Sequence, residues 1–535
     1  MLFILLSKFK KIIRSFSEKE HRLFLIATAI FVLSSIFKIG LAINGATEVI
    51  PVSGGSYREG VIGQPTFINP VISNNQIDLD ISSLIYPRLE TLLDNYDIQE
   101  NGRVYVLTLK EGLVWNNDKK LTSDDVIFTI KLIQNPEVHS PFFESWQGIM
   151  ADRTSELQVK LTLSAPYAFF ADQIKHLLIV PKSVFGHLPP DNLKLSNYNL
   201  EPIGAGPYNF KSFSKRKDGF ITQYHLYLNR KYAGDKPFLR DFYFKFYENL
   251  DDLLKDFRLR QIDGFGSLQP LNPQTDFVPK TNTFYLPMSR YYAIFFNANN
   301  NPLLKQRNFR SALAQAIDRN KIILEVFQNQ AKKIDGPIIN NSENDSITYN
   351  PSASRKLLTD INVSTTSFNL VVPKIDFLQK TASLVKENWQ AIGLTNVNII
   401  ELEPADVLNQ VIKSREYEMI LFGNVLNNNS DLFPFWHSTQ RFYPGLNLSL
   451  YSNQKVDTLI ENIRQNRTIE TQKQQLDQIQ ELIKQDIPAI FLYSLPYVYI
   501  QNKEVEGLTI KQIVWPSDRF NEISHWYLKT ARVFK

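Results

Sequence analysis

The stretch that most constrains the fold is residues 291–327, YYAIFFNANNNPLLKQRNFRSALAQAIDRNKIILEVF, because it predicts a strand, a turn and two helices in succession. Residues 291–296 form an apolar run typical of a strand, and the Asn-Asn-Asn-Pro sequence at 299–302 ends it. Asp318 stands where the N-cap of the second helix is expected. Apolar side chains recur at helical spacing on either side of it, namely Phe309, Leu313, Ala316, Ile317, Ile322, Ile323, Val326 and Phe327.

The size of the chain indicates more than one structural unit. Its 535 residues, 43% of them apolar and 12% aromatic, are enough for two or three units with large buried cores. The sequence contains no cysteine, which excludes structural disulfides, thiolate metal sites, cysteine catalysis and a lipid-modified cysteine anchor.

An apolar segment near the N-terminus predicts one membrane span. Residues 23–43 number 21, and at about 1.5 Å each they match a hydrocarbon core of roughly 30 Å. Residues 1–22 are rich in lysine and arginine, so the positive-inside rule places them in the cytoplasm and the C-terminal bulk outside, as a single-pass protein of the cell membrane. A cleaved signal peptide is the alternative, but the basic region is long and residues 42–46 make a poor cleavage site. We expect a retained anchor.

The charge balance argues against binding to nucleic acid. Residues 1–43 carry seven basic and two acidic side chains, and their net charge of +5 equals that of the whole chain. The outer part is therefore close to neutral, whereas nucleic-acid binding needs a basic surface.

No pattern in the sequence demands catalysis. There is no HxxxH or HExxH pair, no GxSxG elbow and no Walker loop. Asp124 and Asp125 are explained by a helix start in which Thr122 is the N-cap and Asp125 the third residue. We predict no catalytic residue, no metal site and no cofactor.

Several segments, in order along the chain, resemble the family-5 extracellular solute-binding proteins, which are the receptors of peptide and nickel importers. The segments are VYVLTLKEGLVWNNDKKLTSDDVIFTI at 104–130, EPIGAGPYNF at 201–210, FNANNNPLLKQRNFRSALAQAIDRNKII at 296–323 and GLNLSLYSNQKVDTLI at 445–460. The resemblance implies two α/β lobes of the type II periplasmic-binding-protein class with an extra subdomain. We expect lobe I at 50–294 and 488–535, the inserted subdomain at about 94–200, and lobe II at 295–487.

The segment with most bearing on recognition is residues 421–443. In the peptide-binding members that it resembles, the first of two aspartates pairs with the terminal ammonium of the ligand. Here that position falls among Asn427, Asn428 and Asn429, whereas Asp431 aligns best with the second aspartate. We expect Asp431 to hold an ammonium, with the asparagines completing the hydrogen bonds.

Aromatic side chains follow the asparagines and are candidates for ligand contact: Phe433, Trp436, His437 and Tyr443. A polar loop followed by a packed aromatic cluster is the alternative interpretation, and a lone histidine among apolar residues is more often structural.

The resemblance implies a monomeric receptor that captures oligopeptides in an interlobe cleft and delivers them to the permease subunits of an ABC transporter. Because the acidic anchor is missing at the first position, a non-peptide solute such as a sugar, a nickel chelate or haem is a second hypothesis. An anchored hydrolase is a third, and it would need a catalytic constellation that the sequence does not show.

Overall fold

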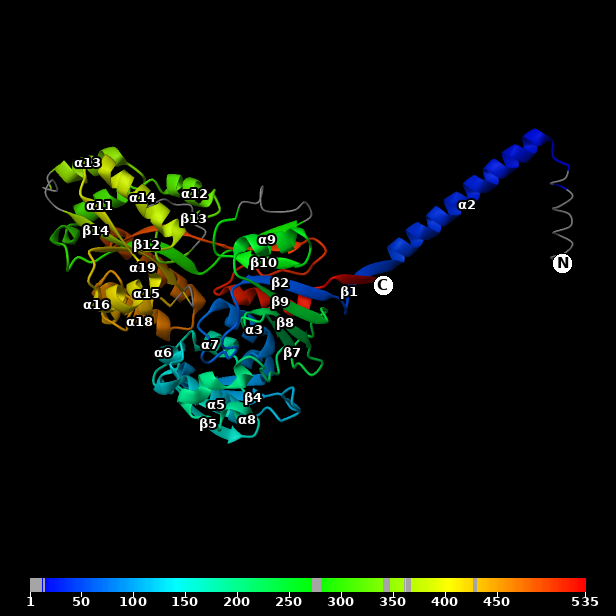
Figure 1. The fold of residues 1–535 in the computed structure, drawn as a ribbon, viewed down its shortest axis with the longest axis horizontal. Helices are drawn as coiled ribbons and strands as arrows, with labels where there is room; N and C mark the ends of the chain where they lie inside the picture. The colour runs from blue at the N-terminus through cyan, green and yellow to red at the C-terminus, as the bar shows by residue number, and fades with distance from the viewer. Residues whose placement is uncertain are drawn as a thin grey trace.

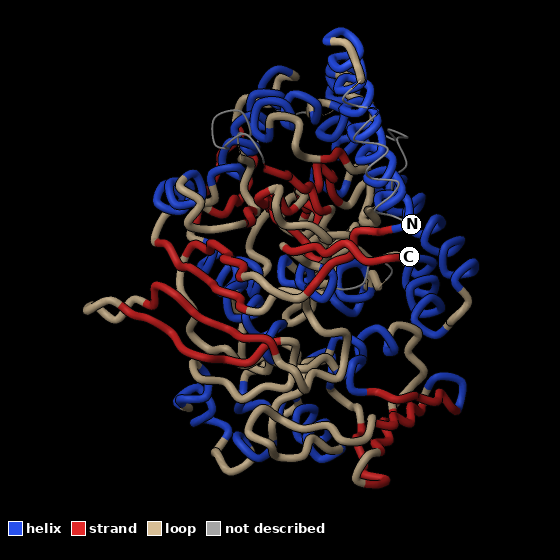
Figure 2. The backbone as a smooth tube through the Cα atoms, turned by 90° about the vertical axis from the view of Figure 1, so that its right-hand side faces the viewer, coloured by secondary structure: helices blue, strands red, loops and turns tan. Residues whose placement is uncertain are grey.

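The computed structural model describes residues 12, 15–271, 281–339, 347–359, 361, 367–426 and 431–535. Over these residues the chain forms two lobes and a long N-terminal helix that projects from one of them (Figure 1). A seven-stranded sheet forms lobe I together with an inserted four-stranded sheet, a six-stranded sheet forms lobe II, and a two-stranded ribbon joins the long helix to lobe I. Helices cover the sheets (Figure 2). This arrangement confirms the expected two-lobed α/β architecture with an extra subdomain.

The projecting helix α2 (Glu18–Ala46) contains the expected span at 23–43. Ser17 and Glu20 form a capping box at its start, which satisfies two of the first backbone N–H groups. None of its residues is buried in the protein, and among the described residues it is the one helix long and apolar enough to cross a membrane.

Lobe I is built on a mixed sheet with the strand order β11-β18-β10-β2-β9-β8-β7. β2 lies at its centre, parallel to both of its neighbours, β10 and β9. The strands are β2 (Ser56–Ile62), β7 (Tyr208–Lys215), β8 (Ile221–Leu228), β9 (Asp241–Tyr247), β10 (Gly264–Ser267), β11 (Thr281–Leu286) and β18 (Tyr497–Asn502).

The two faces of this sheet are covered by different helices. Side chains alternate between the faces of a strand, and on β18 Tyr499 belongs to the large core whereas Val498 and Ile500 belong to a smaller one. The helices are α3 (Gln76–Ile85), η8 (Pro516–Phe520) and η9 (Ile523–His525) on the large core, and α9 (Leu250–Arg258) on the small core.

The inserted subdomain is an antiparallel sheet with the order β3-β4-β6-β5. Thr122 accepts the Asp124 N–H and Asp125 accepts the Thr122 N–H, so the predicted capping box is confirmed. Its elements are α4 (Leu89–Leu92), β3 (Leu93–Gln99), η1 (Glu100–Gly102), β4 (Val104–Leu109), α5 (Ser123–Ile133), η2 (Pro136–Val138), α6 (Phe143–Trp146), β5 (Met150–Ser155), β6 (Gln158–Thr162), α7 (Phe170–His176), α8 (Lys182–Phe185), η3 (Pro190–Leu195) and η4 (Asn197–Asn199).

Lobe II is a sheet with the order β13-β17-β12-β16-β14-β15, and one hydrophobic core covers each of its faces. Its strands are β12 (Arg290–Phe296), β13 (Lys332–Lys333), β14 (Phe368–Pro373), β15 (Val397–Leu402), β16 (Met419–Val425) and β17 (Ala489–Ser494). Its helices are η5 (Pro302–Lys305), α11 (Arg307–Gln315), α12 (Arg319–Phe327), α13 (Pro351–Thr359), α14 (Asp376–Ala391), α15 (Pro404–Asp406), η6 (Val407–Val411), α16 (Ile412–Ser414), α17 (Phe433–Trp436), η7 (Ser438–Gln440), α18 (Gln454–Gln465) and α19 (Ile469–Asp486).

The central stretch folds as its sequence predicts. β12 covers the predicted strand, and α11 and α12 are the two predicted helices. The Asp318 carboxylate accepts the Lys321 N–H at 3.0 Å, which confirms the N-cap. Ala316 and Ile317 follow the last residue of α11 but are buried in the same core as Phe309.

In the described part of the chain, two short segments connect the lobes. Residues 287–289 join β11 in lobe I to β12 in lobe II, and residues 495–496 join β17 in lobe II to β18 in lobe I. The sheets therefore divide the chain a few residues from the boundaries expected at 294/295 and 487/488. β12 and β17 pair with each other, so both lie wholly in lobe II.

A buried ionic cluster holds lobe I together next to the second connection. One nitrogen of Arg519, Nη2, donates to Glu59 Oε1 at 2.8 Å and to Asp80 Oδ2 at 2.7 Å, and all three residues are buried. Tyr499 donates to the other oxygen of Glu59 at 2.7 Å. Burial raises the pKa of Glu59, and the positive charge of Arg519 opposes that rise. The cluster therefore depends on its single guanidinium to compensate two carboxylates.

We predict that Arg519→Met lowers the free energy of unfolding by roughly 3–5 kcal/mol, because it leaves buried carboxylates without a cation. Without the guanidinium the pKa of Glu59 rises further, so the penalty should grow as pH rises above the ordinary carboxyl pKa and fade in acid, where Glu59 is protonated.

Thermal unfolding measured from acidic to neutral pH checks this prediction. Arg216→Met is the matched control, because it breaks exposed ion pairs with Asp218 and Glu248 and a surface contact with the Phe220 ring, and should change stability little. A stability loss in Arg519→Met that is independent of pH would contradict the electrostatic explanation.

Candidate ligand-binding site

The expected recognition segment begins beside the first connection between the lobes. The Leu426 N–H donates to the backbone carbonyl of Ser289 at 2.7 Å, so the end of β16 is tied to residues 287–289. Asn427, Asn428 and Asn429 lie outside the described residues, and their expected role stays a prediction. Asp431, the next described residue, lies at the contact between the two lobes.

Asp431 meets a residue from the opposite lobe. The Tyr167 hydroxyl, which belongs to the inserted subdomain, donates to Asp431 Oδ2 at 2.6 Å, and the Phe433 N–H donates to Oδ1 at 3.2 Å. The Asp431 side chain is only 10% exposed. Burial, together with the adjacent carboxylate, raises the pKa of Tyr167, so this hydroxyl keeps its proton and stays a donor.

Arg464 completes this interlobe contact from α18. Its Nε lies 3.5 Å from Asp431 Oδ2, and its guanidinium lies 4.9 Å from the centre of the Tyr167 ring and 4.3 Å from that of Phe433. Its carbonyl accepts the Ala168 N–H at 2.6 Å. A cation between two aromatic rings and a carboxylate thus links the inserted subdomain to lobe II. We call Tyr167, Asp431, Phe433 and Arg464 the interlobe cluster.

The other aromatic candidates lie in three different settings. Trp436 is buried in the lobe II core, where its Nε1 donates to Tyr291 Oη at 3.2 Å. His437 is buried beside the cluster, and its ring stacks on Phe433 with centroids 4.4 Å apart. Tyr443 is exposed on a loop beneath the Lys413 ammonium. The structure thus brings Asp431, Phe433 and His437 together and leaves Trp436 and Tyr443 apart from them.

His437 has partners for both ring nitrogens. Nδ1 lies 2.8 Å from Thr439 Oγ1, and Nε2 lies 3.2 Å from Glu461 Oε1. These contacts fix the orientation of the imidazole ring, which stacks on Phe433.

Sequence reasoning missed Tyr167 and Arg464. Tyr167 lies 264 residues from Asp431, so no local pattern could pair them. The available signal was the aromatic run Tyr-Ala-Phe-Phe at 167–170, which has too many aromatics for a simple connection.

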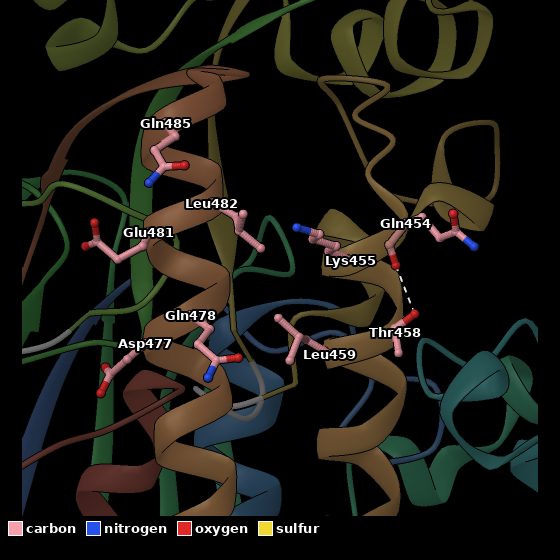
Figure 3. Close-up of a pocket in the computed structure, with 9 residues that line it drawn as sticks. All are labelled: Gln454, Lys455, Thr458, Leu459, Asp477, Gln478, Glu481, Leu482 and Gln485. Atoms are coloured by element: carbon pink, nitrogen blue, oxygen red, sulfur yellow. Dashed lines mark hydrogen bonds between the residues drawn. The ribbon is translucent and has the colours of Figure 1, made fainter.

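A groove of about 800 Å³ lies elsewhere, on the surface of lobe II. Leu459 of α18 and Leu482 of α19 point toward each other across it (Figure 3). All of the described residues that line it come from lobe II, so this groove does not lie between the lobes.

Among the residues that the structure describes, no group of three His, Cys, Asp or Glu side chains could hold a metal ion.

Two lobes joined by two adjacent connections define the type II class of solute-binding proteins, and comparison identifies the family within it. Residues 90–442 match the model of the bacterial extracellular solute-binding proteins, family 5 (middle region). This match spans more than half of the chain, which therefore belongs to that family. Its members are substrate-binding proteins of ABC importers and not enzymes.

Known proteins resemble the chain over most of its length. The oligopeptide-binding protein AppA of Bacillus subtilis (strain 168) is 24% identical over 483 residues, covering 83% of this chain and 87% of AppA. The structure of AppA in complex with a nonapeptide has a TM-score of 0.71 at 22% identity and covers 90% of this chain and 100% of that chain.

Two further solved structures share the fold. The ABC transporter substrate-binding protein CtaP from Listeria monocytogenes has a TM-score of 0.77 at 23% identity, covering 89% of this chain and 99% of that chain. NikZ from Campylobacter jejuni, in complex with Ni(L-His), has a TM-score of 0.69 at 20% identity, with 88% and 99% covered.

We predict that Tyr167→Phe loosens the interlobe contact, because it removes a hydroxyl that donates to a carboxylate, a bond worth roughly 1.5–3 kcal/mol. The backbone amide of Ala168, which bonds across the same contact, should then exchange with solvent faster. Hydrogen exchange read by mass spectrometry measures this. Tyr227→Phe, at an exposed tyrosine of β8, is the control. Unchanged exchange at Ala168 would show that the hydroxyl does not hold the lobes together.

Proposed function

We propose that this protein captures oligopeptides between its two lobes and delivers them to the permease subunits of an ABC importer. The similarity to AppA, which is named for oligopeptide binding and has been solved with a nonapeptide, supports a peptide ligand. The observation that carries the proposal is the interlobe cluster, in which a carboxylate of the expected recognition segment lies at the contact between the lobes.

Hinge closure suits this task because ligand is then buried from both sides. An extended peptide pairs its backbone with protein N–H and carbonyl groups as a neighbouring strand would, so its side chains need not be recognised individually. The short connections at 287–289 and 495–496 are the places where the chain would bend. One receptor monomer would bind one peptide.

Asp431 is the proposed anchor for the amino terminus of the peptide. A carboxylate has about four lone-pair positions. Among the described residues, Tyr167 and Phe433 donate hydrogen bonds to two of them, and Arg464 Nε forms an ion pair with Oδ2 at 3.5 Å. A terminal ammonium that entered the contact would take a remaining position, and Asn427, Asn428 and Asn429 remain the neutral acceptors predicted from the sequence. Phe433 and His437 would form the adjoining apolar wall.

We predict that Asp431→Asn weakens the binding of free-amine peptides about tenfold or more, because a charge-assisted bond contributes roughly 1.5–3 kcal/mol. N-acetylated peptides lack the ammonium and should bind the variant and the natural protein alike. Isothermal titration with matched free and acetylated peptides measures both effects.

Tyr167→Phe separates the anchor from a purely mechanical role. It keeps the carboxylate but removes the interlobe bond, so it should affect free and acetylated peptides equally. If Asp431→Asn also affects both peptides equally, Asp431 only holds the lobes together and does not anchor the ligand.

A non-peptide solute is the second candidate. It is favoured by the uncharged Asn427, Asn428 and Asn429 at the position where peptide-binding relatives are expected to have an acid, and NikZ shows that the same fold holds a nickel–histidine complex. Binding of such a complex with no binding of peptides would establish this alternative.

We also propose that α2 is retained as a membrane anchor, with residues 1–22 in the cytoplasm and the lobes outside. The length and apolar character of α2 and the basic residues before it support this topology. Membranes washed with alkaline carbonate should keep the protein. A soluble mature chain that begins after residue 46 would instead show a cleaved signal peptide.

A further inference from the structure

The C-terminus of the chain returns to the base of α2. β1 (Thr47–Val52) begins at the residue that follows the last residue of α2, and it pairs antiparallel with β19 (Lys529–Phe534) along its whole length. Thr47 lies opposite Phe534, so the last residues of the chain lie next to the end of the helix (Figure 1).

Hydrogen bonds tie these two ends together. The Lys535 N–H donates to the Ala46 carbonyl at 2.9 Å. Arg532 Nη1 donates to Asn44 Oδ1 at 2.6 Å and to Thr47 Oγ1 at 3.3 Å. Thr47 Oγ1 of β1 donates to the Ile43 carbonyl at 2.6 Å. The last turn of α2 is therefore bonded to both strands of the ribbon, and the helix does not continue into a flexible linker.

One face of the ribbon carries exposed apolar side chains beside an arginine. The register places Val49 opposite Arg532 and two pairs along from Phe534, so the three side chains share a face. Phe534 is 78% exposed and Val49 is 56% exposed. A two-stranded ribbon with so little burial is marginal in water, and this face gains stability only if something apolar covers it.

We propose that the end of the β1–β19 ribbon lies in the outer interface of the membrane and forms part of the anchor. Phe534 and Val49 would enter the boundary between headgroups and acyl chains, and Arg532 and Lys535 would contact anionic headgroups. The occupant of this face is the lipid surface, because the face continues directly from the apolar helix. This inference rests on the proposed retention of α2.

The ribbon then fixes how the receptor stands on the membrane. Both strands lead into lobe I, whereas lobe II lies on the far side of lobe I from α2 (Figure 1). Six paired residues at about 3.3 Å each hold lobe I roughly 20 Å from the end of the helix. Lobe I stays close to the bilayer, and opening of the lobes moves lobe II.

The absence of native cysteine allows a direct test with single labels. The full chain carrying Phe534→Cys is labelled with an environment-sensitive fluorophore and reconstituted in vesicles of phosphatidylcholine and phosphatidylglycerol. Nitroxide-labelled lipids then report the depth of the probe. Matched labels are placed with Lys529→Cys, at the other end of β19, and with Leu195→Cys, which is 77% exposed on the inserted subdomain.

We expect blue-shifted emission and strong quenching by headgroup nitroxides at position 534, weaker quenching at 529 and none at 195. Equal thermal unfolding of the three labelled proteins excludes misfolding as a cause. If the protein resists carbonate extraction but position 534 is quenched no more than position 195, the ribbon inference is overturned and the anchor stands. If carbonate removes the protein, both the anchor and the ribbon inference fail.

Discussion

In the described residues, two short segments carry the chain between its lobes, and the arrangement of the lobes depends on their position. Residues 287–289 and 495–496 lie at the ends of strands that pair within each lobe, β11 with β18 and β12 with β17. Each lobe keeps its own sheet, and Phe169 of the inserted subdomain packs into one of the lobe II cores. A relative motion of the lobes would therefore bend the chain at these two segments and separate Phe169 from that core. The buried cluster of Arg519, Glu59 and Asp80 lies close to the second segment and stabilises lobe I there.

The interlobe cluster is a second place where the two lobes are in contact, apart from the two connecting segments. Tyr167 of the inserted subdomain donates to Asp431 of lobe II, and Arg464 of lobe II contacts the Tyr167 ring. These two interactions exist only when the lobes meet, whereas the Arg464–Asp431 ion pair lies within lobe II. A ligand that binds at this contact exchanges some of these interactions for its own. Differential binding of that kind is what shifts a population between open and closed states.

Features set by local sequence were predictable, and features set by distant contacts were not. The helices after β12 and their Asp318 cap, and the Thr122–Asp125 capping box, follow from residues three or four apart. Lobe boundaries were displaced because an apolar run such as 489–494 does not reveal which sheet it joins, although Pro287 and Pro496 mark both connections. The contact between Asp431 and Tyr167 could not be predicted, because the two residues are 264 positions apart in the sequence. The burial of Trp436 shows that an aromatic run does not reveal which of its rings face a ligand.

The central claim is that the two lobes hold a peptide, and native mass spectrometry of the full chain released from detergent micelles tests it most directly. The protein is incubated with a mixture of free-amine peptides, a nickel–histidine complex and simple sugars at equal concentrations. Our account predicts one added peptide mass per protein, which disappears when the complex is denatured. A protein that binds the nickel complex or a sugar and leaves every peptide unbound would contradict it.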